Sequence, residues 1–134
     1  MPSNTEPQSL GPRPSALGPA LVVLFLLPRL ALLYAREPFF DELFTRWIGA
    51  KPFGGILDAL RFDSGPPLYY FLVHLLGDPP LLVLRAVSLL FAFAAFLFIL
   101  SAKRLGEARF WAAALLAVYP PAVILSVYAR SYSL

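Results

Sequence analysis

The chain has 134 residues, of which 59% are hydrophobic and 14% are charged, and its mean hydropathy is +0.71. This composition is typical of an integral membrane protein and exceeds what a soluble domain usually carries. The absence of cysteine excludes disulfide frameworks, zinc–thiolate clusters and thiol nucleophiles, and a net charge of +3 without a basic stripe excludes a nucleic-acid-binding surface. We therefore expect an all-α, polytopic membrane protein.

Residues 1–16 are rich in Pro, Ser and Gly, and we expect them to form a disordered tail. Residues 17–35 are almost uninterrupted apolar sequence with Pro28 and Arg29 as the irregularities, and they are long enough for a first transmembrane helix. A cleavable signal peptide is the competing interpretation. It is disfavoured because the tail is long and scarcely basic and no clear small-residue cleavage site follows.

The loop over residues 36–80 is predicted to contain membrane-surface helices. Its first part has apolar residues at helical spacing on one side and polar residues on the other, which indicates an amphipathic helix with an aromatic face at the headgroup boundary. The apolar positions are Phe40, Leu43, Phe44, Trp47 and Ile48, and the opposite side carries Asp41, Glu42, Thr45 and Arg46. A weaker amphipathic helix follows, with Ile56, Leu57 and Leu60 opposite Asp58 and Arg61.

Residues 66–76 are apolar but have only about half of the roughly 20 residues that a span needs, so we expect a short helix at the interface. Residues 81–102 and 110–128 are predicted as the second and third transmembrane helices. In the second, Arg85 is expected to reach out to the headgroups. In the third, Pro120 and Pro121 are expected to introduce a kink.

The short loop over residues 103–109 carries three cations and is predicted to be cytoplasmic by the positive-inside rule. The loop over residues 36–80 then lies outside, and residues 129–134 begin a second outer loop. The predicted location is the plasma (inner) membrane.

The Asp41–Glu42 pair has a structural and a functional interpretation. Acids in the first turn of a helix complement its dipole, and Glu42 has a partner at i+4 in Arg46. Acids held beside a membrane span also commonly face a polar cavity or a ligand, because burying them in hydrocarbon costs about 2.5–3.5 kcal/mol. Both interpretations stay open on composition and spacing alone.

The order of several motifs resembles the amino-terminal part of GT-C-type glycosyltransferases, most closely in pattern the protein O-mannosyltransferase superfamily and bacterial lipid A sugar transferases. The segments that carry the resemblance are Phe40-Asp41-Glu42, Asp63-Ser64-Gly65-Pro66-Pro67-Leu68-Tyr69-Tyr70, Arg85-Ala86-Val87-Ser88 and Ala129-Arg130-Ser131-Tyr132-Ser133-Leu134. Each motif alone is weak, whereas their order and spacing together cover nearly all of the chain from Leu21.

The resemblance implies transfer of a sugar from a polyprenyl-phosphate donor to a hydroxyl of a glycan, lipid or protein acceptor on the outer face, with inversion at the anomeric carbon. Asp41 matches the family's catalytic Asp, with Glu42 as its neighbour. A divalent metal, Mg²⁺ or Mn²⁺, is used by some relatives, and Asp41 and Glu42 are then its candidate ligands. Arg130 first, then Arg61, is the candidate for binding the lipid phosphate. Asp63 and Tyr69 complete the candidate substrate site.

The chain departs from the family pattern in three ways. Gly65 stands where relatives often have His, and the lone His74 is expected to be packed or interfacial. Tyr128 stands where many relatives have Glu, so a second outer-loop carboxylate is either missing or lies further along the chain. The family has many more spans, so we expect an amino-terminal fragment, inactive by itself. The alternative is a small non-enzymatic membrane protein that binds a partner through its spans or its acidic loop.

Overall fold

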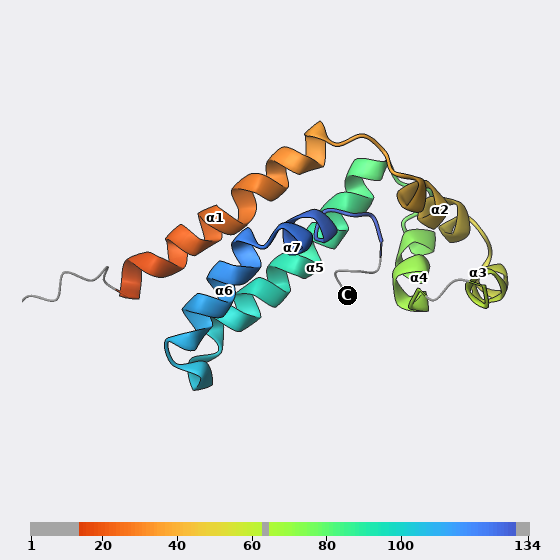
Figure 1. Ribbon diagram of the computed structural model, residues 1–134. Coiled ribbons are helices and arrows are strands. Elements are labelled where there is room, and N and C mark those ends of the chain that lie inside the picture. The colour runs from red at the N-terminus through yellow and green to blue at the C-terminus, as the bar shows by residue number, and fades with distance from the viewer. Residues whose placement is uncertain (1–13, 63–64, 131–134) are drawn as a thin grey trace, which may run out of the picture.

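The computed structural model describes residues 14–62 and 65–130, and the elements formed by these residues are all helical (Figure 1). This agrees with the predicted all-α class. In chain order the elements are α1 (Pro14–Ala35), α2 (Phe40–Gly49), α3 (Phe53–Leu60), α4 (Pro67–Leu75), α5 (Leu81–Ser101), the 3₁₀ turn η1 (Lys103–Leu105), α6 (Ala108–Val118) and α7 (Pro120–Leu125).

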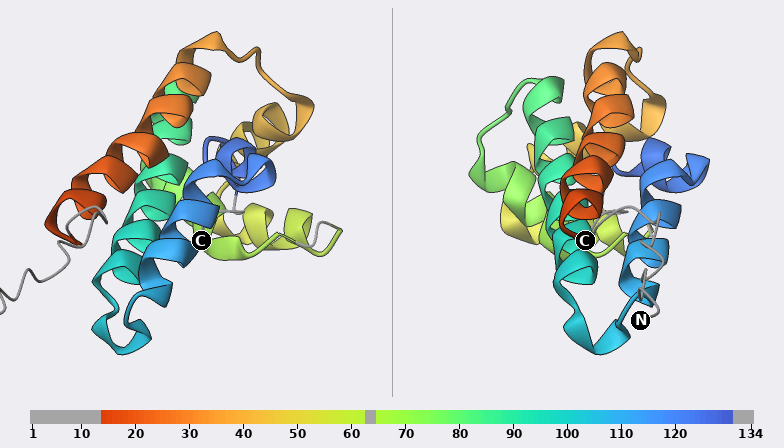
Figure 2. Two further views of the ribbon diagram at one scale, coloured as in Figure 1. Left: turned by 60° about the vertical axis from the view of Figure 1, so that its left-hand side comes forward. Right: turned by 90° about the vertical axis from the view of Figure 1, so that its left-hand side faces the viewer.

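Two groups of helices make up the fold (Figures 1 and 2). Helices α1, α5 and α6 pack against one another and form what we call the bundle. Helices α2, α3 and α4 form what we call the shelf, which lies at the end of the bundle where α1 finishes and α5 begins (Figure 1). Turn η1 lies at the other end, so the acidic and basic connections are separated by the length of the bundle.

The bundle core is built from aromatic residues of two helices and small residues of the third. Phe25 of α1 and Phe96 of α5 are fully buried, with ring centroids 4.4 Å apart. Ala113 and Ala117 of α6 are also fully buried. Alanine leaves room for a close approach between α6 and its neighbours, which allows the two phenylalanines to fill the space between the three helices.

Two helices of the described residues are long and apolar enough to cross a membrane, over 17–35 and 81–101. Much of their apolar surface is not covered by the rest of the chain. Leu27 of α1 is 68% exposed, and Leu90 and Phe98 of α5 are likewise exposed. Helix α1 begins at Pro14, so the predicted disordered tail is wrong for residues 14–16, while residues 1–13 lie outside the described part of the chain.

The predicted third span over residues 110–128 is not one helix. Helix α6 ends at Val118, Tyr119 is extended with φ −64° and ψ 115°, and α7 starts at Pro120. The physical reason is that Pro120 and Pro121 have no backbone N–H to continue the hydrogen-bond ladder of α6, and a proline ring disfavours helical geometry in the residue before it. The expected kink is therefore a complete break.

The helices predicted within residues 36–80 are present as α2, α3 and α4. In α2 the aromatic side faces outward, with Phe40 74% exposed and Trp47 57% exposed, while Glu42 and Thr45 are fully buried. Ile48, which the sequence pattern places on the apolar side, is also fully buried and packs with Ile56 and Tyr70. The face of α2 that contacts the rest of the protein therefore combines Glu42 and Thr45 with Ile48.

Helix α2 packs on α4 through a glycine. A Cβ atom added to Gly49 would lie 2.4 Å from Cγ1 of Val73, closer than atoms can approach. Nδ1 of the half-buried His74 lies 3.0 Å from the Gly49 carbonyl oxygen, so His74 contacts α2 from α4. Glycine is thus required at this crossing because only its backbone leaves room for Val73.

We predict that Gly49→Ala destabilises the protein by about 1–3 kcal/mol, the usual cost of overpacking a tight contact. Thermal unfolding of the purified protein in detergent measures this. Gly54→Ala is the matched control because no atom lies within 4 Å of its added Cβ, and alanine there is expected to be neutral or slightly stabilising. Equal effects of the two substitutions would contradict the close approach.

Candidate functional site

A buried ion pair lies where the shelf meets the bundle. Arg85 of α5 donates from Nε to Oε1 of Glu42 at 2.8 Å and from Nη2 to Oε2 at 2.6 Å. Glu42 is fully buried and Arg85 is 4% exposed. The two parallel bonds make the forked geometry that best matches a guanidinium to a carboxylate.

The remaining hydrogen-bonding capacity of Arg85 is used on the end of α1. Its Nη1 donates to the carbonyl oxygens of Leu33 and Arg36, and its Nη2 donates to that of Glu37. These carbonyls lie in the last turn of α1 and just beyond it, where carbonyls lack intrahelical partners. Arg85 therefore caps α1 with its side chain while it holds Glu42.

Glu42 likewise accepts two backbone hydrogen bonds in addition to those from Arg85. The Phe39 N–H donates to Oε2 and the Ala129 N–H donates to Oε1, each at 3.1 Å. The first bond is the return contact of a capping box at the start of α2. The second ties α2 to the segment that follows α7, 87 residues away in the chain.

Two expectations about these side chains are wrong. Arg85 does not reach outward to a headgroup region, because Glu42 and three carbonyls satisfy it inside the protein. Glu42 does not pair with Arg46 at i+4, since Arg46 forms an ion pair with Asp78 in the turn between α4 and α5. In both cases a partner distant in the sequence is preferred, to the i+4 neighbour for Glu42 and to the headgroup region for Arg85.

The hydrogen bonds set the protonation of Glu42. Burial alone raises the pKa of its carboxyl, but the hydrogen bonds from Arg85, Ala129 and Phe39 outweigh burial, and the pKa lies below its usual range. Glu42 is therefore ionised at neutral pH and serves as an acceptor of four bonds.

Asp41, the neighbour of Glu42, pairs with Arg130. The Arg130 Nη1 lies 2.8 Å from Oδ2 of Asp41. Asp41 is 32% exposed and Arg130 is 13% exposed, so the pair is accessible at its edge. Two consecutive residues of α2 thus engage the consecutive residues 129 and 130, which brings together two of the residues that the sequence singled out.

The other predicted site residues are elsewhere. Arg61 is exposed at the end of α3 and pairs with Asp58. Tyr69 is fully buried, where its hydroxyl donates to the Leu84 carbonyl at 3.1 Å and lies 2.8 Å from Ser88 Oγ. Burial raises the pKa of Tyr69 to about 12. The Tyr69 hydroxyl thus links α4 to α5 inside the protein. Asp63 lies outside the described residues.

Asp41 and Glu42 are the candidate ligands if a divalent metal is used, and in this arrangement Glu42 does not fit that role. Both oxygens of Glu42 already accept two hydrogen bonds each, so neither is available to a cation. Asp41 faces a guanidinium. Among residues 14–62 and 65–130 there is also no cluster of three or more His, Cys, Asp or Glu side chains suited to a metal.

Residues that neighbour Asp41 and Arg130 in the sequence make an aromatic and cationic cluster. Tyr128 lies under the Arg36 guanidinium, 3.6 Å from the ring centroid, and makes an edge contact with Phe39. Sequence reasoning missed Arg36 and misassigned Arg85. The sequence feature that indicates a structural role for Arg85 is its place in the Arg-x-x-Ser motif, since Ser88 of the same motif contacts Tyr69.

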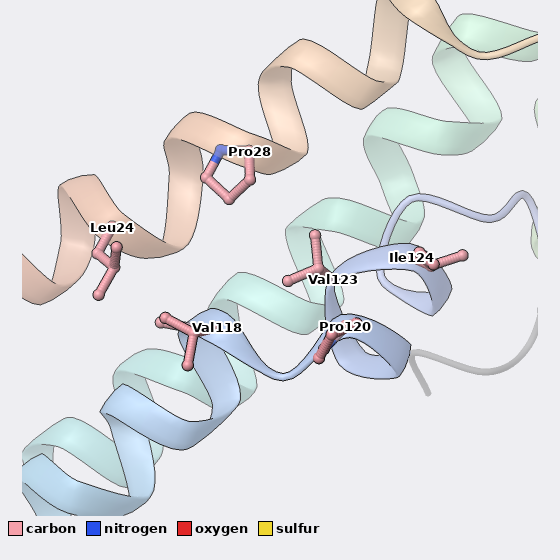
Figure 3. A pocket seen from close by; sticks show the side chains of 7 residues that line it. Leu24, Pro28, Val118, Pro120, Val123 and Ile124 are labelled. Atoms are coloured by element: carbon pink, nitrogen blue, oxygen red, sulfur yellow. The ribbon is translucent and has the colours of Figure 1, made fainter.

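An apolar pocket of about 360 Å³ lies between α1 and the α6–α7 break (Figure 3). It is lined by Leu24, Pro28, Ala117, Val118, Pro120, Val123 and Ile124. None of these side chains is ionisable, and none belongs to the Asp41–Arg130 site. The pocket has no group that would perform acid–base chemistry.

Comparison with known proteins found that no family model, no curated protein and no solved structure matches the chain. The Asp41–Arg130 pair and the Glu42–Arg85 pair beneath it are thus interpreted on their geometry.

We predict that Glu42→Gln lowers the free energy of unfolding at pH 7 by about 3–5 kcal/mol, because it leaves Arg85 without its counter-charge. A carboxylate with a lowered folded pKa contributes stability above its unfolded pKa of about 4.3, and this stability is lost as pH falls through the folded value. The difference between the native protein and the variant should therefore shrink below about pH 4.3.

Chemical unfolding at a series of pH values measures this difference. Glu107→Gln is the control because Glu107 is exposed and has no side-chain capping bond, and its cost should stay within about 0.5 kcal/mol. A pH-independent penalty for Glu42→Gln would contradict the assignment of an ionised Glu42.

Proposed function

We propose that the chain is a multi-pass membrane protein whose shelf lies at the outer surface. Two observations support this placement. The long helices α1 and α5 leave leucine and phenylalanine side chains uncovered, as helices in contact with lipid do. The aromatic side of α2 also faces outward, as expected for a helix in the interface. The basic turn η1 lies at the opposite end of the bundle (Figure 1) and would be cytoplasmic.

The proposed activity of the complete protein is transfer of a sugar from a polyprenyl-phosphate donor to an acceptor hydroxyl. The observation that carries the proposal is the contact between Asp41 and Arg130 at a partly open position on the shelf. The reaction needs a carboxylate to take the acceptor proton and a cation to stabilise the departing phosphate. This pair supplies one of each.

In the proposed reaction, the donor phosphate replaces Asp41 as the partner of Arg130. The freed carboxylate oxygen of Asp41 then accepts the proton of the acceptor hydroxyl. The acceptor oxygen forms its bond to the anomeric carbon as the bond from that carbon to the phosphate oxygen breaks, and the electron pair leaves with the polyprenyl phosphate. Attack from the face opposite the phosphate inverts the configuration.

Glu42 has a positioning role in this proposal. Its four hydrogen bonds fix the backbone of α2 and the N–H of Ala129 in one arrangement. Asp41 and Arg130 are the adjacent residues on the two segments. The base and the cation are then in place before the substrate binds, so they need not reorganise during the reaction. Such preorganisation is the main source of electrostatic catalysis.

A non-enzymatic membrane protein that binds a partner is the second candidate. The specific observation in its favour is that Arg85 fully engages Glu42, so the Asp-Glu motif offers one carboxylate to a ligand and not two. An exposed aromatic face on α2 would be the corresponding contact surface. The two candidates differ in whether Asp41 is required for turnover.

We predict that Asp41→Asn lowers the turnover of a polyprenyl-phosphate mannose donor by at least about 100-fold, because the general base is lost while the side chain keeps its size. Membranes that contain the complete native protein or its variant are supplied with the donor, and the release of polyprenyl phosphate is measured by mass spectrometry. Asp58→Asn on α3 is the control and should leave turnover unchanged, since Asp58 is exposed and pairs only loosely with Arg61 at 3.6 Å. Full turnover by Asp41→Asn would remove the catalytic role.

A further inference from the structure

A second arginine is buried in the bundle, in the middle of the apolar helix α1. Arg29 is fully buried, and its guanidinium lies over the ring of Phe25 at 3.7 Å from the centroid. Unlike Arg85, it has no carboxylate partner among the described residues. Its hydrogen-bond partners are the Ser126 hydroxyl and the backbone carbonyls of Phe25, Leu116 and Ala117.

Two of these carbonyls are the ones that the proline pair leaves without donors. In a continuous helix the N–H of residue 120 would bond to the carbonyl of Leu116, and that of residue 121 to the carbonyl of Ala117. Proline has no N–H, so Pro120 and Pro121 supply neither bond. Arg29 supplies both instead, from Nη2 to Leu116 at 2.9 Å and from Nη1 to Ala117 at 3.1 Å.

Arg29 also holds the far side of the break. Its Nε donates to Ser126 Oγ at 2.8 Å, and that hydroxyl donates to the Val123 carbonyl at 2.8 Å. Ser126 is the residue that follows α7. One side chain therefore bonds to the end of α6 and to the end of α7, and fixes the angle between them.

The angle at this break determines where the chain goes next. After α7 the segment runs toward the shelf (Figure 1), where the Ala129 N–H bonds to Glu42 and Arg130 pairs with Asp41. A straight continuation of α6 would carry residues 129 and 130 along the bundle axis instead. The contact between Asp41 and Arg130 thus requires the corner at Tyr119.

We propose that Arg29 is a positioning residue that replaces the two N–H groups missing at Pro120 and Pro121, and that it thereby holds Arg130 against Asp41. Its influence on activity rests on the function proposed above, whereas its influence on the corner does not. Arg29 is not a ligand-binding residue, because four of its five N–H groups already donate within the protein.

The test measures the distance between α2 and α7 with spin labels in the full-length protein in lipid nanodiscs. Residues 1–134 contain no cysteine, so Phe40→Cys and Ile124→Cys introduce the two labelling positions within them, and any cysteine elsewhere in the protein is replaced by serine. Both residues are exposed. Arg29→Met is expected to shift or broaden the distance distribution. Arg104→Met, an exposed position in η1 at the other end of the bundle, is the control and should change nothing.

The decisive comparison adds Pro120→Ala and Pro121→Ala, which restore both backbone donors. In that background the α2–α7 distance should move to a new value, because α6 and α7 join into one helix, and Arg29→Met should cause no additional change. An unchanged distribution in Arg29→Met with the prolines present would overturn the proposal. The same effect of Arg29→Met with and without the prolines would overturn it as well.

If the Arg29→Met protein fails to insert into the membrane, its folding yield with and without the two proline substitutions provides the same comparison. Restoring the two donors with alanines should then rescue the yield of the Arg29→Met protein, whereas no rescue would overturn the proposal. Arg29→Lys is expected to behave like Arg29→Met, because a single ammonium group does not reproduce the planar fork that spans both carbonyls.

Turnover of polyprenyl-phosphate mannose separates this inference from the proposed function. Arg29→Met should raise KM for the donor by about 10-fold or more and also lower kcat, because the displaced Arg130 no longer binds the donor phosphate or stabilises it as it departs. An unaltered KM alongside an altered distance would show that the corner does not position Arg130 for the donor. No turnover by the native protein would refute the proposed function and leave the distance experiment intact.

Discussion

A buried carboxylate and a buried guanidinium, Glu42 and Arg85, hold the two parts of this protein together. The pair joins the start of α2 to α5, and its additional bonds reach the end of α1 and Ala129. Burying two charges is costly, and the cost is offset only when geometry and hydrogen bonding are complete. Here every neighbouring segment supplies a partner, so the ion pair sets where the segments meet.

Arg29 and Arg85 perform related tasks with different partners. Both donate to main-chain carbonyls that lack a helical N–H, at the break before α7 and at the end of α1. In hydrocarbon each unsatisfied backbone group costs several kcal/mol, so an arginine that satisfies several of them offsets its own burial. The consequence for the site is that Asp41 and Arg130 meet because two arginines fix the ends of the segments that carry them.

Sequence patterns predicted the helices between residues 36 and 80 well, and for α2 the reason is that the period of Phe40, Phe44 and Trp47 is a local property of the helix. They failed for Arg85, whose partner Glu42 is 43 residues away and on another helix. The break at Tyr119 was visible in its two prolines, but nothing local shows that Arg29 supplies the missing donors. Which polar groups pair over a long distance depends on how the segments pack. The spacing of residues within one segment carries no information about that packing.

A double-mutant cycle on Glu42 and Arg85 tests most directly whether this pair organises the fold. The free energy of unfolding is measured for the native protein, Glu42→Gln, Arg85→Met and the double variant. If each single change leaves a buried partner unsatisfied, the double variant should cost less than the sum of the single variants by about 2 kcal/mol or more. Costs that add to within about 0.5 kcal/mol would contradict the account.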